Sequence, residues 1–174
     1  MPEERAARRP PARVLGIDPG SVVTGYGVVE MDGGRLIHVA SGVIRPRAGA
    51  AFVDRLTAIF DGLSEVIVQL APTAAAVESI PHARHAVSAL KLGHARGVAM
   101  LAAARAGLPL TEHNPLEVKK ALVGYGKAEK DQVHAMVQRL LGVRLEGPMD
   151  RSDALAVAIC HLHASRTRAL LEGR

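Results

Sequence analysis

The sequence predicts an α/β domain in which a mixed β-sheet is flanked by helices. Two observations support this prediction. Runs rich in β-branched residues, joined by short turns, open the chain, and apolar stretches of strand length then alternate with amphipathic helical stretches. With 174 residues, 48% of them hydrophobic, the chain is long enough to bury the core of one such domain.

Three strands are expected at the start of the domain. Residues 14–18 form an apolar run that ends at Asp18, because the Pro-Gly pair after it turns the chain. Residues 22–31 and 36–44 are rich in β-branched residues, and the Asp-Gly-Gly sequence at 32–34 between them is typical of a hairpin. We therefore expect three antiparallel strands, with Asp18 at the end of the first.

Helices and strands alternate through the rest of the chain. Apolar residues recur at spacings of three and four between Phe52 and Leu70, which indicates one buried face of a helix. An alanine-rich run that ends in Glu78 predicts a fourth strand. The elements expected from here on are a helix over 52–70, a strand over 74–78, a helix over 84–106, a strand over 108–111 and helices over 128–141 and 150–165.

A hairpin-built sheet followed by crossover helices is typical of the ribonuclease H-like architecture, here with three antiparallel strands plus two parallel strands. We expect one domain over 13–166, a disordered basic tail over 1–12 and a C-terminal tail over 167–174. The opening residues are too polar for a signal peptide, and no apolar run is long enough to span a bilayer. A cytoplasmic protein without membrane contact is the expectation.

Charge and cysteine content narrow the functional classes. The net charge of +5 and a pI near 9.9 favour polyanionic partners without distinguishing DNA from RNA or a membrane surface. The single cysteine, Cys160, excludes an intramolecular disulfide. It lies in an apolar run, so we expect a buried, unreactive thiol in a reducing cytoplasm.

Four acidic residues occupy similar places in the predicted fold. Asp18 and Glu78 end two central strands, and Asp150 and Asp153 share one face at the start of the last helix. If these places meet, the carboxylates repel one another and favour binding of divalent cations. Magnesium or manganese suits such ligands, and two ions about 3.5–4 Å apart can clamp a phosphodiester during its hydrolysis.

Each acid also has a structural interpretation. Asp18 can shape the turn that follows it, and Asp150 can cap the last helix with Asp153 supporting its first turn. Glu78 is harder to explain in this way. It is the polar end of an apolar strand, where an acid needs a partner or solvent.

Four blocks of sequence resemble the RuvC-type Holliday junction resolvases in order and spacing. They are Gly16-Ile17-Asp18-Pro19-Gly20, Val77-Glu78, the run Ser-Ala-Leu-Lys-Leu-Gly-His-Ala-Arg-Gly-Val at 88–98, and Asp150-Arg151-Ser152-Asp153-Ala154-Leu155-Ala156. Each block alone is weak, but together they span about 13–163 and are highly specific.

The resemblance implies a crossover junction endodeoxyribonuclease that acts in homologous recombination and DNA repair. Such an enzyme resolves four-way DNA junctions as a homodimer, by symmetric paired nicking of two strands of like polarity. The resemblance assigns catalysis and the binding of two Mg²⁺ or Mn²⁺ ions to Asp18, Glu78, Asp150 and Asp153. It also suggests coupling to the RuvA–RuvB branch-migration complex.

Four lysines surround the glycines at 124 and 126 in a basic segment that we expect to be flexible and suited to contact with phosphates: Lys119, Lys120, Lys127 and Lys130. Lys119 and Lys130 match DNA-contacting lysines of the family. The alternative is an ordinary solvated helix face.

One segment departs from the family pattern. Relatives often carry an aromatic residue just after the strand-ending glutamate, thought to wedge the junction open, whereas this chain has Ser79-Ile80-Pro81-His82. Isoleucine and proline also wedge between base steps in some proteins, so Ile80 and Pro81 are the candidates for opening the junction.

Two further patterns leave alternatives open. Gly93 and Gly97 would let the long helix approach its two-fold copy closely, or they simply pack on the helix's own sheet. His161 and His163 are two apart on a helix and make a poor ligand pair, so surface or helix-end positions are expected for them.

Two other functional classes compete. The Gly16–Gly20 block also resembles the phosphate-facing hairpin of actin-like and sugar-kinase-like ATPases, but those proteins duplicate the domain and this chain is too short. A non-catalytic module that binds branched DNA through its lysines would leave the four acids unexplained, because clustered negative charge opposes DNA binding.

Overall fold

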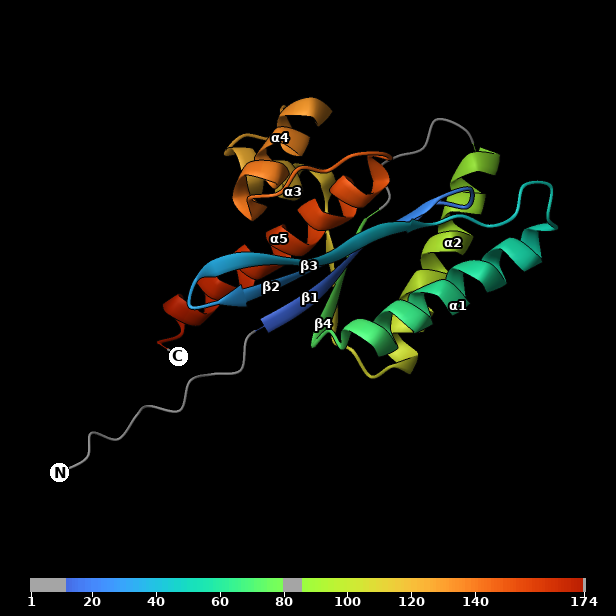
Figure 1. Ribbon diagram of the computed structural model, residues 1–174, viewed down its shortest axis with the longest axis horizontal. Coiled ribbons are helices and arrows are strands. Elements are labelled where there is room, and N and C mark those ends of the chain that lie inside the picture. The colour runs from blue at the N-terminus through green and yellow to red at the C-terminus, as the bar shows by residue number, and fades with distance from the viewer. Residues whose placement is uncertain (1–11, 80–85, 174) are drawn as a thin grey trace.

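The structure is a computed structural model that describes residues 12–79 and 86–173. Its strands are β1 (Ala12–Asp18), β2 (Thr24–Asp32), β3 (Arg35–Ile44), β4 (Ala74–Glu78) and β5 (Leu110–His113). Its helices are α1 (Phe52–Leu70), α2 (Ala86–Arg105), α3 (Pro115–Val123), α4 (Lys130–Leu141) and α5 (Asp150–Leu171). Figure 1 shows their arrangement.

The strands form one sheet in the order β3-β2-β1-β4-β5. β1 to β3 pair antiparallel, whereas β4 and β5 run parallel to β1. Gly33 and Gly34 close the β2–β3 hairpin with φ angles of 58° and 89°, a region that glycine adopts at little cost. The predicted mixed sheet, three antiparallel strands plus two parallel strands with flanking helices, is confirmed.

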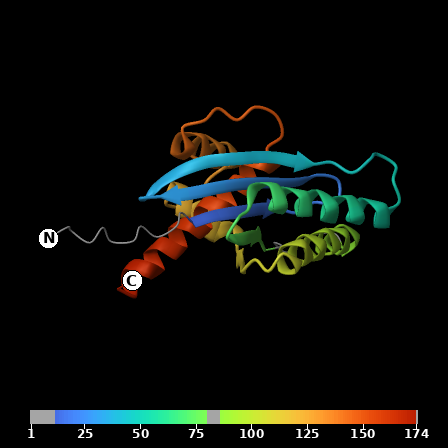
Figure 2. The same ribbon diagram turned by 60° about the horizontal axis from the view of Figure 1, so that its bottom comes forward.

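Helices cover both faces of the sheet. α1 and α2 lie on one face, while α3, α4 and α5 lie on the other (Figures 1 and 2). On the α1–α2 face, Leu15, Ile17 and Val28 of the sheet are fully buried together with Ile59 and Leu63 of α1. This face is an ordinary core of large apolar side chains, worth roughly 1.5–3 kcal/mol for each one buried.

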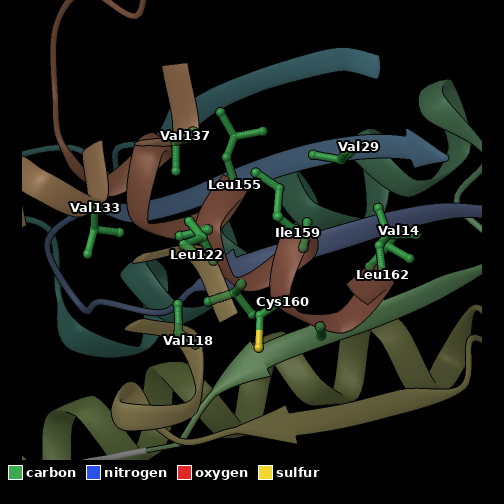
Figure 3. Close-up of a cluster of buried hydrophobic side chains, with 14 of the residues drawn as sticks. Val14, Val29, Val118, Leu122, Val133, Val137, Leu155, Ile159, Cys160 and Leu162 are labelled. Carbon is green, nitrogen blue, oxygen red and sulfur yellow. The ribbon is translucent and has the colours of Figure 1, made fainter. Parts of the chain in front are cut away.

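The other face is built around α5. Figure 3 shows Leu155, Ile159 and Leu162 of α5 packed between the strands and the apolar side chains of α3 and α4. Within the described residues, no helix is both long and apolar enough to cross a bilayer.

Glycines on β1 and β2 let α5 lie close against the sheet. A Cβ atom at Gly16 would lie 2.0 Å from the backbone oxygen of Ala154, and one at Gly27 would lie 2.6 Å from the side chain of Leu155. Gly16 and Gly27 are register partners on neighbouring strands. Because neither residue has a side chain, α5 can lie directly on the backbone of β1 and β2 at this pair, and any larger residue would overlap atoms of the helix.

The structure corrects several element boundaries. The basic segment that was expected to be flexible contains helix α3, which begins with a capping box: the Asn114 side chain accepts from the Glu117 N–H, and the Glu117 carboxylate accepts from the Asn114 N–H. β5 lies at 110–113 and not at 108–111, and α4 begins at Lys130 and not at 128. α5 continues past 165 to Leu171, so 167–171, expected as a tail, is helical.

Some expectations fall on residues that the structure does not describe. Most of the tail expected over 1–12, the start of the second long helix at 84 and the junction-opening candidates Ile80 and Pro81 lie outside the described residues. Ala12 is already part of β1.

Candidate active site

Strand geometry places Asp18 and Glu78 side by side. β1 and β4 are parallel neighbours in which Ile17 pairs with Val77, so the next residue of each strand is an acid. Side chains alternate between the faces of a strand. Val14 and Ala76 belong to the core on the α5 face, and Asp18 and Glu78 follow them at even spacings. Both carboxylates therefore point toward α5, at the end of the sheet where its parallel strands finish.

The first turn of α5 lies at this same end. Gly25 of β2 is the register partner of Asp18, and a Cβ atom at Gly25 would lie 2.1 Å from the backbone oxygen of Asp150. Glycine at this position lets the helix start rest directly on the strand beside Asp18. Asp150 and Asp153 are thereby brought to the strand-end acids.

Electrostatics show that the four acids form one cluster. Burial raises the pKa of Asp18 to about 7, and the negative charges of Asp153, Glu78 and Asp150 contribute to this rise. The pKa of Glu78 is also raised, mainly by burial and then by the charge of Asp153. A nearby cation would stabilise the ionised form of these carboxylates and relieve their repulsion, so the cluster favours cation binding.

Two lysines lie at the cluster. The Lys130 ammonium is 3.2 Å from Asp153 Oδ2, and this contact raises the pKa of Lys130. The charges of Lys130 and Lys119 offset part of the rise in the pKa of Glu78. A pocket of about 80 Å³ beside the cluster is lined by Glu78, Asp153, both lysines and apolar residues of α3, α4 and α5.

The other two predicted lysines lie apart from the acids. Lys120 lines a different groove, between α3 and the second half of α5, together with His163 and Arg168. Lys127 is exposed in the turn between α3 and α4 and does not line the acid pocket. Of the four lysines, the structure brings only Lys119 and Lys130 to the acids.

The donor chemistry of the cluster fits divalent metal ions. Four carboxylates supply the oxygen ligands that Mg²⁺ and Mn²⁺ prefer, and their mutual repulsion is what a cation relieves. In the conformation described, no three acidic, histidine or cysteine side chains of residues 12–79 and 86–173 are arranged closely enough to hold an ion. Lys130 instead supplies a positive charge at Asp153. Side-chain movement would therefore accompany metal binding.

Several residues that support the site were not identified from the sequence. The hydroxyl of Thr24, which is fully buried, donates to the Gly20 carbonyl at 2.8 Å, and Arg55 of α1 donates to the Ser21 carbonyl. Both contacts fix the turn after Asp18. On the other strand end, Arg96 Nε lies 3.4 Å from the Glu78 carbonyl oxygen and its guanidinium pairs with Glu112. Such contacts depend on tertiary packing, which no sequence motif signals.

The structure tests the predicted positions of Cys160 and His161. Cys160 is 3% exposed, which confirms that its thiol is buried, and burial raises its pKa to about 11, which disfavours the reactive thiolate. The expected surface or helix-end position of His161 is wrong. α5 is longer than predicted, so His161 lies mid-helix, half-buried, with its Nδ1 3.2 Å from His113 Nε2.

Comparisons with known proteins agree with this geometry. The family model described as "Crossover junction endodeoxyribonuclease RuvC" matches residues 14–161. The RuvC protein of Syntrophotalea carbinolica is 56% identical over 159 residues, which is 91% of this chain and 99% of that protein.

Solved structures give the same result. Thermus thermophilus RuvC in complex with a Holliday junction substrate has a TM-score of 0.84 at 34% identity, covering 90% of this chain and 96% of that one. The yeast mitochondrial Holliday junction resolvase has a TM-score of 0.63 at 15% identity, which shows a shared fold alone. Because the family model matches most of its length and a relative is more than half identical to it, the chain belongs to the RuvC family of crossover junction endodeoxyribonucleases.

Proposed function

We propose that this chain resolves four-way DNA junctions by hydrolysing one phosphodiester in each of two opposed strands, at a site formed by Asp18, Glu78, Asp150 and Asp153. The observation that supports this most strongly is the convergence of the four carboxylates at one end of the sheet, expressed in the raised pKa of Asp18. Membership of an endonuclease family decides against both the ATPase and the non-catalytic binding module.

The four acids are the residues that would hold two Mg²⁺ or Mn²⁺ ions. When bound, such ions supply Lewis-acid stabilisation of the charge that develops on the scissile phosphate. The chain's own contribution is to hold the carboxylates together on rigid elements: two strand ends and a helix start. Glycines at the α5 contact keep that spacing short.

The lysines divide between two tasks. Lys119 and Lys130 lie at the acids, where their charges suit the phosphates that flank the cut. Lys130 is 76% exposed, so a DNA phosphate can draw it away from Asp153. Lys120 and Lys127 lie outside the pocket and are proposed to contact phosphates farther along the arms.

A homodimer is proposed to form through α2. Ala95, Ala99 and Ala103 of this helix are fully buried against its own sheet, whereas Cβ atoms at Gly93 and Gly97 would meet nothing within 4 Å. These two glycines therefore do not pack on the chain's own sheet. An apolar groove between α1 and α2 includes both glycines, and Leu90 beside them is 64% exposed. A two-fold dimer would present two sites to a four-way junction.

The remaining proposals rest on the family resemblance and on composition. We propose coupling to a RuvA–RuvB branch-migration complex, a role for Ile80 or Pro81 in opening the junction, and a cytoplasmic location. The nuclease domain is proposed to span about 13–166, with α5 extending beyond it.

The test is cleavage of a synthetic four-way junction with Mg²⁺ or Mn²⁺, compared with a linear duplex of the same sequence. Wild type should give paired nicks in the junction only, and Asp18→Asn should keep junction binding while nicking is lost. A variant that still nicks at the wild-type rate would overturn the assignment of Asp18. Binding without nicking by the wild type would overturn the proposed activity.

A further inference from the structure

The helix turn that carries two of the four acids lacks a side-chain cap. Met149 stands at the N-cap position of α5 in a helical conformation and makes no side-chain cap hydrogen bond. By contrast, α3 begins with a capping box, and at the start of α4 the Gln132 side chain accepts from the Glu129 N–H. The N–H groups of Ser152 and Asp153 donate to the Met149 carbonyl at 2.8 and 2.9 Å. An uncapped first turn frays easily, so its position depends on its neighbours.

Helix α4 supplies one such neighbour. His134 Nδ1 lies 2.8 Å from Ser152 Oγ, within hydrogen-bond distance. Ser152 is 1% exposed and stands between Asp150 and Asp153 in the chain, while His134 is half-buried. The bond therefore anchors the middle of the acid-bearing turn to α4.

This anchor differs from the second contact between the same two helices. Lys130, one turn before His134, pairs with Asp153 at 3.2 Å, but its side chain is 76% exposed. An exposed ion pair is weak and competes with solvent ions and phosphates. The His134–Ser152 bond is shielded from this competition because the hydroxyl is buried, and it does not involve Lys130.

We propose that His134 is a positioning residue for Asp150 and Asp153, acting through the buried hydroxyl of Ser152. The inference rests on the proposed metal-binding role of those acids. Removal of a group that holds metal ligands in position through hydrogen bonds commonly lowers metal affinity or activity by about 10–100-fold. The effect of His134 should therefore appear in the metal requirement.

The chain offers a matched control on the same helix. Gln138, one turn after His134 and also half-buried, accepts a hydrogen bond from the Leu145 N–H at 2.8 Å. It ties α4 to the loop before α5 and does not touch the acid-bearing turn. Gln138→Ala therefore removes a bond of equal length from the same helix without loosening Ser152.

The experiment compares five full-length variants with wild type: His134→Ala, His134→Asn, Ser152→Ala, Gln138→Ala and the double variant of His134→Ala and Ser152→Ala. Mn²⁺ alone is titrated by calorimetry, nicking of the junction is measured against Mn²⁺ concentration, and junction affinity is measured in EDTA. His134→Ala and Ser152→Ala should each raise the Mn²⁺ dissociation constant and the half-saturating Mn²⁺ by about tenfold. Junction affinity in EDTA should stay within about twofold of wild type.

The remaining variants separate positioning from stability. The double variant of His134→Ala and Ser152→Ala should be no worse than either alone, because both remove the same bond. His134→Asn keeps a polar group near the ring Nδ1 and should recover most of the metal affinity, while Gln138→Ala should change it by less than about twofold. If His134→Ala does not fold, Ser152→Ala decides the question.

The inference is overturned if Mn²⁺ affinity is unchanged in Ser152→Ala and His134→Ala, or if Gln138→Ala weakens it equally. A wild type that neither binds Mn²⁺ nor nicks would instead overturn the proposed function. The two failures are therefore distinguishable.

Discussion

The two faces of the sheet are packed by opposite means. Under α1 and α2, large side chains such as Leu15 and Ile17 fill the space between sheet and helix. Under α5, glycines at 16, 25 and 27 leave room for the helix backbone itself. The first arrangement buries apolar volume and stabilises the fold. The second also buries large side chains of α5, but at these three glycines it gives up side-chain volume, and the start of α5 comes close enough to the strand ends for four carboxylates to meet.

The largest effect is expected at the point where α5 touches β2. In Gly25→Ala the new Cβ would lie 2.1 Å from the Asp150 backbone oxygen, so the acid-bearing turn must move. A displacement of about 1 Å at a catalytic group can cost 100-fold in rate, and we expect nicking to fall by at least about that factor. Single-turnover cleavage of a four-way junction measures it.

A glycine on the other face is the control. A Cβ atom at Gly62 of α1 would lie 3.0–3.1 Å from side-chain atoms of Ile44, so any adjustment is made by a side chain on the face of the sheet away from the acids and not by the acid-bearing turn. Gly62→Ala should cleave within about twofold of wild type. Equal losses in both variants would mean that the close α5 contact has no special part in the site.

A substitution in the α1–α2 core should lower stability and leave the metal requirement of cleavage unchanged. Leu63 is fully buried in that core, and Leu63→Ala should lower the free energy of unfolding by about 2–5 kcal/mol. Below its unfolding temperature the variant should nick with the wild-type Mn²⁺ requirement. Denaturant unfolding and a metal titration of cleavage measure the two quantities, and a changed metal requirement would contradict the separation of the two faces.

The negative charge of Asp18 should lower the free energy of unfolding when no metal is bound. The native pKa of Asp18 is about 7 and its ordinary value is 3.8, so the native state binds more protons than the unfolded state between these values. The free energy of unfolding therefore falls as pH rises from about 4 to about 7. At pH 8 in EDTA, Asp18→Asn should be more stable than wild type by roughly 1–3 kcal/mol, less than the full shift because solvent screens the charge.

The difference should disappear below about pH 4, where Asp18 is protonated in both states. Added Mn²⁺ should raise the unfolding midpoint of wild type more than that of Asp18→Asn. Thermal unfolding across pH, with and without Mn²⁺, measures both effects. If wild type in EDTA instead gained stability relative to Asp18→Asn between pH 4 and 7, the raised pKa of Asp18 would be contradicted.

The smallest expected effect is on the salt dependence of junction affinity, to which the lysines contribute. Phosphate contacts release counterions, so junction affinity should fall steeply with salt, and Lys119→Ala should reduce the slope of log affinity against log salt by about 1. Lys91 is exposed on α2, on the opposite face of the sheet, and Lys91→Ala is the control with an unchanged slope. Filter binding in EDTA over a range of salt concentrations compares them.

Sequence patterns predicted the parts of this molecule that follow from local periodicity. The strand-end positions of Asp18 and Glu78 follow from apolar runs that stop at an acid, and the shared face of Asp150 and Asp153 follows from helical spacing. Helix α3 was missed although its signal was present. Asn114, Pro115 and Glu117 form the N-terminal pattern of a helix, but the lysines and glycines after them were interpreted as a flexible segment.

Contacts between segments that are distant in the sequence could not be predicted from local sequence patterns. The roles of Gly16 and Gly27 depend on how closely α5 approaches the sheet, and the His134–Ser152 bond depends on how α4 crosses α5. Periodicity within one segment carries no information about either distance. Strand order was likewise unreadable, because parallel neighbours are not specified by local sequence.

Helix α2 borders an apolar groove and also contacts the end of β4 through one side chain. One side of it lies along the apolar groove at Gly93 and Gly97, and Arg96, between those glycines in the chain, reaches the Glu78 carbonyl and Glu112. One side chain, Arg96, therefore joins the helix that borders this groove to the end of β4 that carries Glu78, so a substitution at Arg96 would reach both places at once.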